Sequence, residues 1–316
     1  MYHFSESGFF DYGFEPGHRY IPGIGKSLLS LCSASVPLFF MINGFLTINK
    51  KYNQKAIIHK IFSIIKVYIF WGSLYCLMFY KGPVNNLIGI LFYFPAWLWF
   101  LKTLVMLYIF NYIYNHLPNK IIWGYFFILC LLIYPFATNF YWFIRVLLNP
   151  ETNFPHWGIT GFFTMYSIVY YLLPQYLSQM INVRVCIILI LIGFIINFFV
   201  VYVYSNFFKA IQDNGNALFP TFGTLLITIG IWKVFKNYEG SLIFTKTIKR
   251  LITFFCDNTL GIYIFHLPII FAFKYLIVEP VNFLSGIAIC VVILILSTLI
   301  SSTIKLSKLG SFLLSL

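Results

Sequence analysis

The stretch VPLFFMINGF, residues 36–45, lies inside an apolar segment that is long enough to cross a membrane. A proline and an Asn-Gly pair interrupt it. In lipid, Pro37 frees a backbone carbonyl group, and Asn43 carries an amide group that must find a partner. The stretch therefore indicates a membrane helix in which these residues serve packing or chemistry.

The composition of the whole chain indicates an integral membrane protein. Of its 316 residues, 60% are hydrophobic and 9% are charged, which is too little charge to cover the surface of a soluble globule of this size. Apolar segments of about 20 residues, the length that crosses a bilayer, lie at 28–48, 61–80, 96–115, 121–138, 158–177, 185–204, 217–235, 259–278 and 286–304. We predict an all-α, polytopic helical bundle with nine full transmembrane helices.

Basic residues gather in alternate connections between these segments. One connection holds Lys50, Lys51, Lys55 and Lys60, and another holds Lys233, Lys236, Lys246, Lys249 and Arg250. The side rich in Lys and Arg should be cytoplasmic, which places the C-terminus inside. The net charge of +13 follows this pattern, so we expect the lipid bilayer and not nucleic acid as the partner. Residues 236–257 are interpreted as a polar connection.

With nine spans, the same orientation places the N-terminus outside. Residues 1–10 have neither a basic region nor a long apolar core, so they are not a signal peptide. The simplest interpretation is a truncated first helix that runs outward and whose beginning is missing from this chain. We therefore predict a single domain over 1–316, with the end of that helix at 1–4, an outer loop at 5–26 and a nine-helix bundle at 27–305.

Four stretches, in this order, resemble the acyltransferase 3 family of bacterial inner-membrane enzymes, which move acetyl or similar groups onto sugars of the cell surface. Residues 36–45 resemble its Pro-x-Phe-Phe-x-x-Ser-Gly-Tyr/Phe segment, with Asn43 where serine is usual. Residues 60–71 hold the place of a basic segment that leads into an aromatic helix. Residues 97–101, followed by Leu107-Tyr108, are similar to its Trp-Phe/Tyr-Leu…Tyr-Leu helix, and residues 259–266 to its Ser-x-Gly-Ile-Tyr-Leu-x-His helix.

The resemblance implies a catalytic residue and a reaction. The family's main catalytic residue is a histidine near the outer part of its first helix, and His3 stands at the matching place. As general base, a neutral imidazole accepts the proton of a sugar hydroxyl group while that hydroxyl attacks the thioester carbonyl of acyl-CoA. The implied co-substrate is acyl-CoA, with acetyl-CoA as the expected donor and no bound cofactor. The implied acceptor is a cell-surface glycan or a lipid-linked sugar.

Further candidates follow for both sides of the membrane. Lys60, Lys66 and His266 are assigned to the acyl-donor side, and Lys102 and Arg145 to the acceptor side. The resemblance also implies that Pro37, Asn43 and Gly44 form a helix-packing motif beside the catalytic first helix.

Structural roles remain as alternatives for several of these residues. The lysines within spans can snorkel to the membrane surface, and Arg145 can pair with Glu151. His266 can hydrogen-bond a carbonyl group that Pro268 frees.

Other functional classes also stay open. A flippase or polymerase of a surface-glycan pathway would have the same polytopic, basic-inside character and would need no histidine in the first helix. A transporter should show broken helices in two similar halves, and the sequence has no such symmetry.

The six cysteines are scattered singly, so no metal site is expected. The predicted location is the bacterial inner membrane, with multiple passes.

Overall fold

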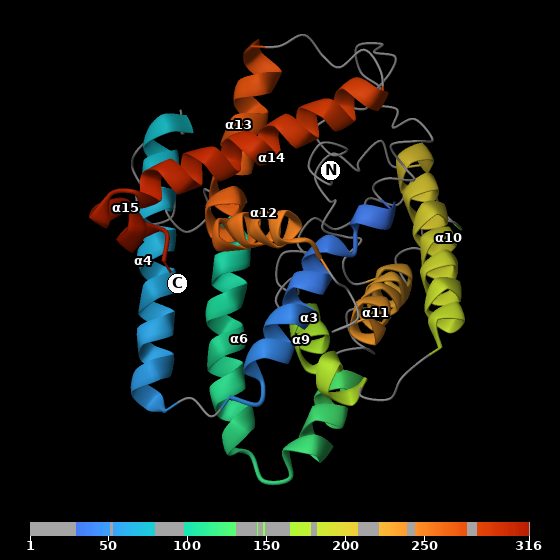
Figure 1. The fold of residues 1–316 in the computed structure, drawn as a ribbon. Helices are drawn as coiled ribbons and strands as arrows, with labels where there is room; N and C mark the ends of the chain where they lie inside the picture. Colours follow the sequence, from blue (N-terminus) through green and yellow to red (C-terminus); the bar gives the residue numbers. More distant parts are fainter. Residues whose placement is uncertain are drawn as a thin grey trace. The chain divides into compact units, whose positions relative to one another are not determined.

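The computed structural model describes residues 30–50, 53–79, 98–130, 165–177, 182–207, 221–238, 244–276 and 283–315, together with 144 and 148. Within these ranges the regular elements are helices, and no strand occurs there (Figure 1). The predicted all-α class is confirmed. The predicted outer loop and the end of the first helix, residues 1–26, lie outside the described residues.

Four helices are long and apolar enough to cross a membrane, namely Ser30–Thr47, Gln54–Met78, Val183–Val200 and Ile287–Lys305. Each coincides with a span predicted from the sequence. A fifth span results if the bent pair Lys246–Asp257 and Thr259–Phe273 crosses as one. These four helices make the chain a multi-pass membrane protein. The other predicted spans do not reach this length and apolarity within the described residues, so the count of nine stays a prediction.

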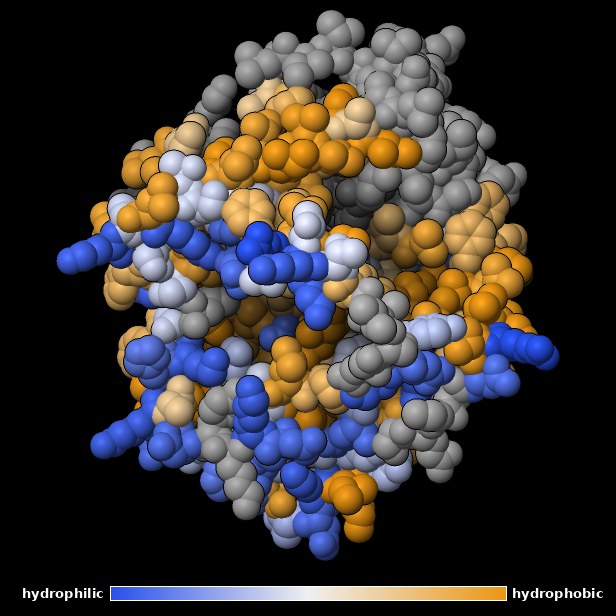
Figure 2. Space-filling model, in the orientation of Figure 1, coloured by the Kyte–Doolittle hydropathy of each residue, from blue (hydrophilic) through white to orange (hydrophobic). Residues whose placement is uncertain are grey.

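The surfaces of these helices are apolar, as expected of helices that face lipid. On α14 (Phe283–Lys305), Val291, Leu294, Ile295 and Leu299 are exposed, and hydrophobic side chains cover this helix in Figure 2. On α10 (Val183–Phe207), Ile188, Leu191 and Ile195 are exposed in the same way. Exposure of such surfaces to water would be unfavourable in free energy, whereas contact with the acyl chains of lipids is not.

One compact unit comprises residues 1–50, 114–243 and 279–287 and contains α3 (Ser35–Thr47), α9 (Met165–Tyr176), α10 and α11 (Phe222–Asn237). Its helices approach closely at glycines. A Cβ atom added to Gly193 of α10 would lie 2.5 Å from the carbonyl oxygen of Gly223 in α11. Small residues of this kind let backbones meet within a membrane, where helix association depends on close packing.

A buried polar network joins three segments of this unit. The Asn197 amide nitrogen donates to Ser33 Oγ at 2.9 Å and to Thr224 Oγ1 at 2.8 Å, and the Thr221 hydroxyl donates to Asn197 Oδ1 at 2.7 Å. All four side chains are buried. Since no water is available in lipid to satisfy these groups, the network fixes α10 against α11 and against the start of the first span.

The second unit comprises residues 51–113, 244–278 and 288–316. Its helices are α4 (Gln54–Phe79), most of α6 (Trp99–His116), α12 (Lys246–Asp257), α13 (Thr259–Leu276), most of α14, and α15 (Lys308–Leu313). Within the predicted polar connection 236–257, residues 246–257 form the helix α12. A bend of 69° separates α12 from α13.

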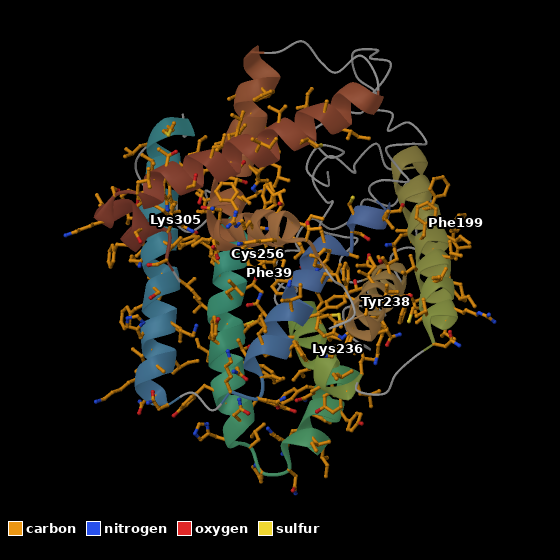
Figure 3. All side chains as sticks on the ribbon, in the orientation of Figure 1. Phe39, Phe199, Lys236, Tyr238, Cys256 and Lys305 are labelled. Atoms are coloured by element: carbon orange, nitrogen blue, oxygen red, sulfur yellow. The ribbon has the colours of Figure 1, made fainter. Side chains whose placement is uncertain are left out.

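Side chains of α14 hold this bend at Asn258. The Ser301 hydroxyl donates to Asn258 Oδ1 at 2.8 Å, while the Asn258 amide nitrogen donates to the carbonyl oxygen of Phe254 at 2.9 Å. Lys305, near the end of α14 (Figure 3), donates to the carbonyl oxygen of Asp257. At Gly261 an added Cβ atom would overlap the Ser301 side chain. The corner between α12 and α13 is therefore fixed by α14.

Candidate functional site

Four predicted site residues lie in the second unit, where α4 carries Lys60 and Lys66, α6 carries Lys102 and α13 carries His266. His3 and Arg145 lie outside the described residues. The part of the site that can be built from geometry is thus the region where α4, α6 and α13 meet.

The His266 ring is oriented by its own helix. Its Nδ1 atom lies 2.7 Å from the carbonyl oxygen of Tyr263 and 3.1 Å from that of Ile262. A carbonyl oxygen can only accept, so Nδ1 carries the proton. In the neutral ring the basic nitrogen is then Nε2, the atom that can accept a proton or a hydrogen bond.

The carbonyl group that Pro268 frees is satisfied by a different residue. A proline removes the hydrogen bond to the carbonyl four residues earlier, which here belongs to Ile264. The buried Tyr75 hydroxyl of α4 donates to this oxygen at 2.8 Å. The alternative in which His266 takes up the freed carbonyl is therefore wrong, since His266 bonds to the preceding turn.

Aromatic contacts fix α13 against α4 and α6. The Trp71 ring of α4 meets the Phe265 ring edge-on, with centroids 4.9 Å apart, and its indole nitrogen donates to the carbonyl oxygen of Leu313 in α15 at 3.3 Å. The Phe100 ring of α6 meets the Tyr263 ring at 5.4 Å. Edge-on ring pairs of this kind stabilise the packing of α13, the helix that carries His266, against α4 and α6.

The lysines of α4 and α6 lie over aromatic rings of the facing helix. Lys60 Nζ of α4 is 5.4 Å from the centre of the Tyr108 ring in α6, and Lys102 Nζ of α6 is 5.6 Å from that of Tyr68 in α4. Such cation–π contacts hold the ammonium groups along the seam between the two helices. The eight residues from Lys60 to Tyr68 correspond to about 12 Å along a helix, so the two lysines occupy different depths.

Lys66 belongs to another surface of α4. Its Nζ atom is 4.0 Å from the centre of the Phe312 ring in α15 and 3.4 Å from the carbonyl oxygen of Ser315. The structure therefore does not bring Lys60 and Lys66, both assigned to the acyl-donor side, to one place.

Tyrosines of α4 and α13 accompany Lys102 and His266. Lys102 lies over the ring of Tyr68 in α4, and the Tyr263 ring of α13 lies 6.0 Å from the His266 ring. We name Tyr68, Tyr75, Lys102, Tyr263 and His266 the α4–α6–α13 cluster. It combines a cation, three phenol hydroxyl groups and an imidazole with a fixed tautomer, which are groups that can position a polar substrate and transfer a proton.

The three tyrosines of this cluster were not predicted from the sequence. With aromatic residues at 22% of the chain, no single tyrosine stands out. One usable signal was present for Tyr263, because it lies three residues before His266 and such a pair shares one face of a helix.

The predicted packing motif lies in the other unit, on α3. An added Cβ atom at Gly44 would overlap the carbonyl oxygen of Tyr171 in α9. Beside it, Thr47 Oγ1 and the Tyr171 hydroxyl are 2.5 Å apart. The Asn43 amide nitrogen donates to the carbonyl oxygen of Phe39 within α3 at 2.9 Å, and Pro37 is buried in the first turn of this helix. Gly44 thus makes the close approach, and α9 is its neighbour.

Among the described residues, no group of three or more His, Cys, Asp or Glu side chains could hold a metal ion. In the comparison with protein families, a model described as an acyltransferase domain matches residues 1–302. Comparison with the curated proteins and with the solved structures gives no match. The matched residues include the described helices from α3 to α13, most of α14, and the positions of His3 and Arg145.

Proposed function

Since the chain belongs to the acyltransferase 3 family, we propose that this membrane acyltransferase moves an acetyl group from acetyl-CoA to a hydroxyl group of a surface polysaccharide or lipid-linked sugar. The family match over 1–302 carries the proposal. The α4–α6–α13 cluster supports it, because it supplies a cation and an oriented imidazole within a helical membrane domain.

The proposed chemistry is the attack of a sugar hydroxyl group on the thioester carbonyl. His3 acts as the general base and takes the hydroxyl proton while the new ester bond forms. The bond between the carbonyl carbon and sulfur then breaks, the CoA sulfur leaves with the electron pair, and the proton that His3 took from the hydroxyl group ends on this sulfur, which returns the imidazole to its neutral form. The acetyl group ends on the sugar as an ester, and free CoA is the second product.

The other candidates are proposed to bind the two substrates. Lys60, Lys66 and His266 act on the acyl-donor side, and because Lys60 and Lys66 lie on different surfaces of α4, each would meet a different part of the donor. Lys102 and Arg145 act on the acceptor side, where their charges can hold the phosphate groups of a lipid-linked sugar. The protein works in the bacterial inner membrane with its C-terminus in the cytoplasm.

The test is an acyl-transfer assay with the purified protein in vesicles, labelled acetyl-CoA and a lipid-linked glycan. We expect label in the glycan only when protein, donor and acceptor are all present. Vesicles without the protein and protein with deacylated CoA are the controls. Translocation or extension of the glycan without acetylation would instead establish the flippase or polymerase function.

A pair of substitutions at His266 separates a functional role from a structural one. Asparagine can keep the hydrogen bond to the preceding turn, as Asn43 and Asn258 do with the carbonyl oxygens of Phe39 and Phe254, but it lacks Nε2. We expect His266→Asn and His266→Ala both to lower transfer about 10- to 100-fold, which corresponds to the loss of one hydrogen bond of a charge-bearing group. Steady-state rates at varied acetyl-CoA concentration measure this effect. Full rescue by asparagine would show that only the helix contact matters.

A further inference from the structure

Helix α12 has two opposite faces of different character. Its sequence is KTIKRLITFFCD, residues 246–257. At 3.6 residues per turn, Ile248, Leu251, Ile252 and Phe255 fall on one face. The other face carries Lys246, Lys249, Arg250, Thr253 and Asp257. Of these charged residues three are basic and one is acidic, so the polar face has a net positive charge.

The apolar face of α12 is largely exposed among the described residues. The exposed fractions are 43% for Ile248, 54% for Leu251 and 43% for Ile252. None of the twelve residues of this helix is buried. Hydrophilic side chains of the opposite face are visible around α12 in Figure 2. A helix with this pattern needs an apolar phase on one side and water or charged groups on the other.

The corner at Asn258 determines the direction of α12. The bend of 69° turns it away from the axis of α13. The bonds from Ser301 and Lys305 tie the corner to α14, a helix that is long and apolar enough to span the membrane. Because the side chains of a spanning helix hold the corner, α12 leaves at the end of that span, where the hydrocarbon meets the headgroups.

We propose that α12 lies in the plane of the membrane surface and binds anionic phospholipids. Its apolar face enters the boundary between headgroups and acyl chains, and Lys246, Lys249 and Arg250 contact the negatively charged headgroups. Charge complementarity identifies this partner, because a basic polar face beside lipid attracts phosphatidylglycerol over zwitterionic lipids. The inference does not depend on which acyl donor or acceptor the enzyme uses.

The first experiment measures lipid retention on the full chain in detergent by native mass spectrometry, with phosphatidylglycerol and phosphatidylcholine as the probes. The test variant is Lys246→Gln/Lys249→Gln/Arg250→Gln, which keeps the apolar face. The matched control is Lys55→Gln/Arg184→Gln/Lys308→Gln, which removes the same charge from exposed positions outside α12. We expect a loss of about fivefold per charge in the preference for phosphatidylglycerol, in the test variant only. Equal retention by wild type and both variants would overturn the proposal.

The second experiment measures depth, and it works even if the charge variant folds poorly. A fluorophore is attached to a cysteine at residue 252 or residue 253 in a full chain whose native cysteines are replaced by alanine. In vesicles of phosphatidylcholine and phosphatidylglycerol, lipids brominated on their acyl chains should quench the probe at 252 and not at 253. Equal quenching at both positions, or none, contradicts the in-plane orientation. If the charge variant instead raises the KM for acetyl-CoA in pure phosphatidylcholine and keeps its lipid retention, the basic face serves the donor and the proposal fails.

Discussion

Replacing His3 by alanine is expected to lower acyl transfer about 10²- to 10⁴-fold, the range over which a general base contributes to a rate. A sugar hydroxyl group is a poor nucleophile at neutral pH, so the step slows when no group accepts its proton. The measurement is the initial rate of label transfer in vesicles, normalised to the amount of folded protein. His3→Gln should be equally slow, because an amide does not accept a proton at neutral pH.

His18→Ala is the matched control for this prediction. His18 lies in the same predicted outer segment, 5–26, and has no proposed role, so its variant should keep the wild-type rate. Full activity of His3→Ala together with a deep loss in His266→Ala would move the general base to His266, whose Nε2 atom is the basic nitrogen of the neutral ring. The comparison therefore assigns the base to one of two named residues.

The membrane class and several spans could be predicted because apolar length is a property of local sequence. The predicted segments 28–48, 61–80, 185–204 and 286–304 all fall on helices that can span a membrane. Helix α12 was not predicted because its mean composition is polar. Its signal is the period of 3.6 residues, which places apolar residues on one face, and a search for long apolar runs does not detect that period.

The site could be predicted only in part because its contacts depend on helix register. Lys60 and Lys102 are visible as cations near aromatic helices, but their pairing with Tyr108 and Tyr68 requires the antiparallel alignment of α4 and α6. At Pro268 the sequence indicates that a carbonyl group is freed. It does not indicate that Tyr75, 189 residues from Ile264 in the chain, satisfies it. Such partners follow from packing across the bundle and not from local pattern.

Replacing Gly44 by alanine is expected to destabilise the protein by about 1–3 kcal/mol or more, the cost of forcing an extra methyl group into a packed site. The atom that the new Cβ would overlap is the backbone carbonyl oxygen of Tyr171. A side chain could rotate away, but a backbone oxygen moves only if α9 shifts as a whole. That shift would also separate Thr47 from the Tyr171 hydroxyl group. The measurement is the fraction of detergent-solubilised protein that remains monodisperse after heating.

Two further variants separate close backbone approach from other effects of substitution on α3 and α9. Leu46→Ala changes a side chain on the same helix that is 54% exposed, and it should leave the heat stability nearly unchanged. Tyr171→Phe keeps the ring and removes the hydroxyl contact with Thr47, and the loss of that hydrogen bond should cost about 0.6 kcal/mol, the average between membrane helices. Since the overlap involves the backbone at 171, Tyr171→Phe should not rescue Gly44→Ala in the double variant. If Gly44→Ala is no less stable than Tyr171→Phe, the two backbones do not meet at Gly44.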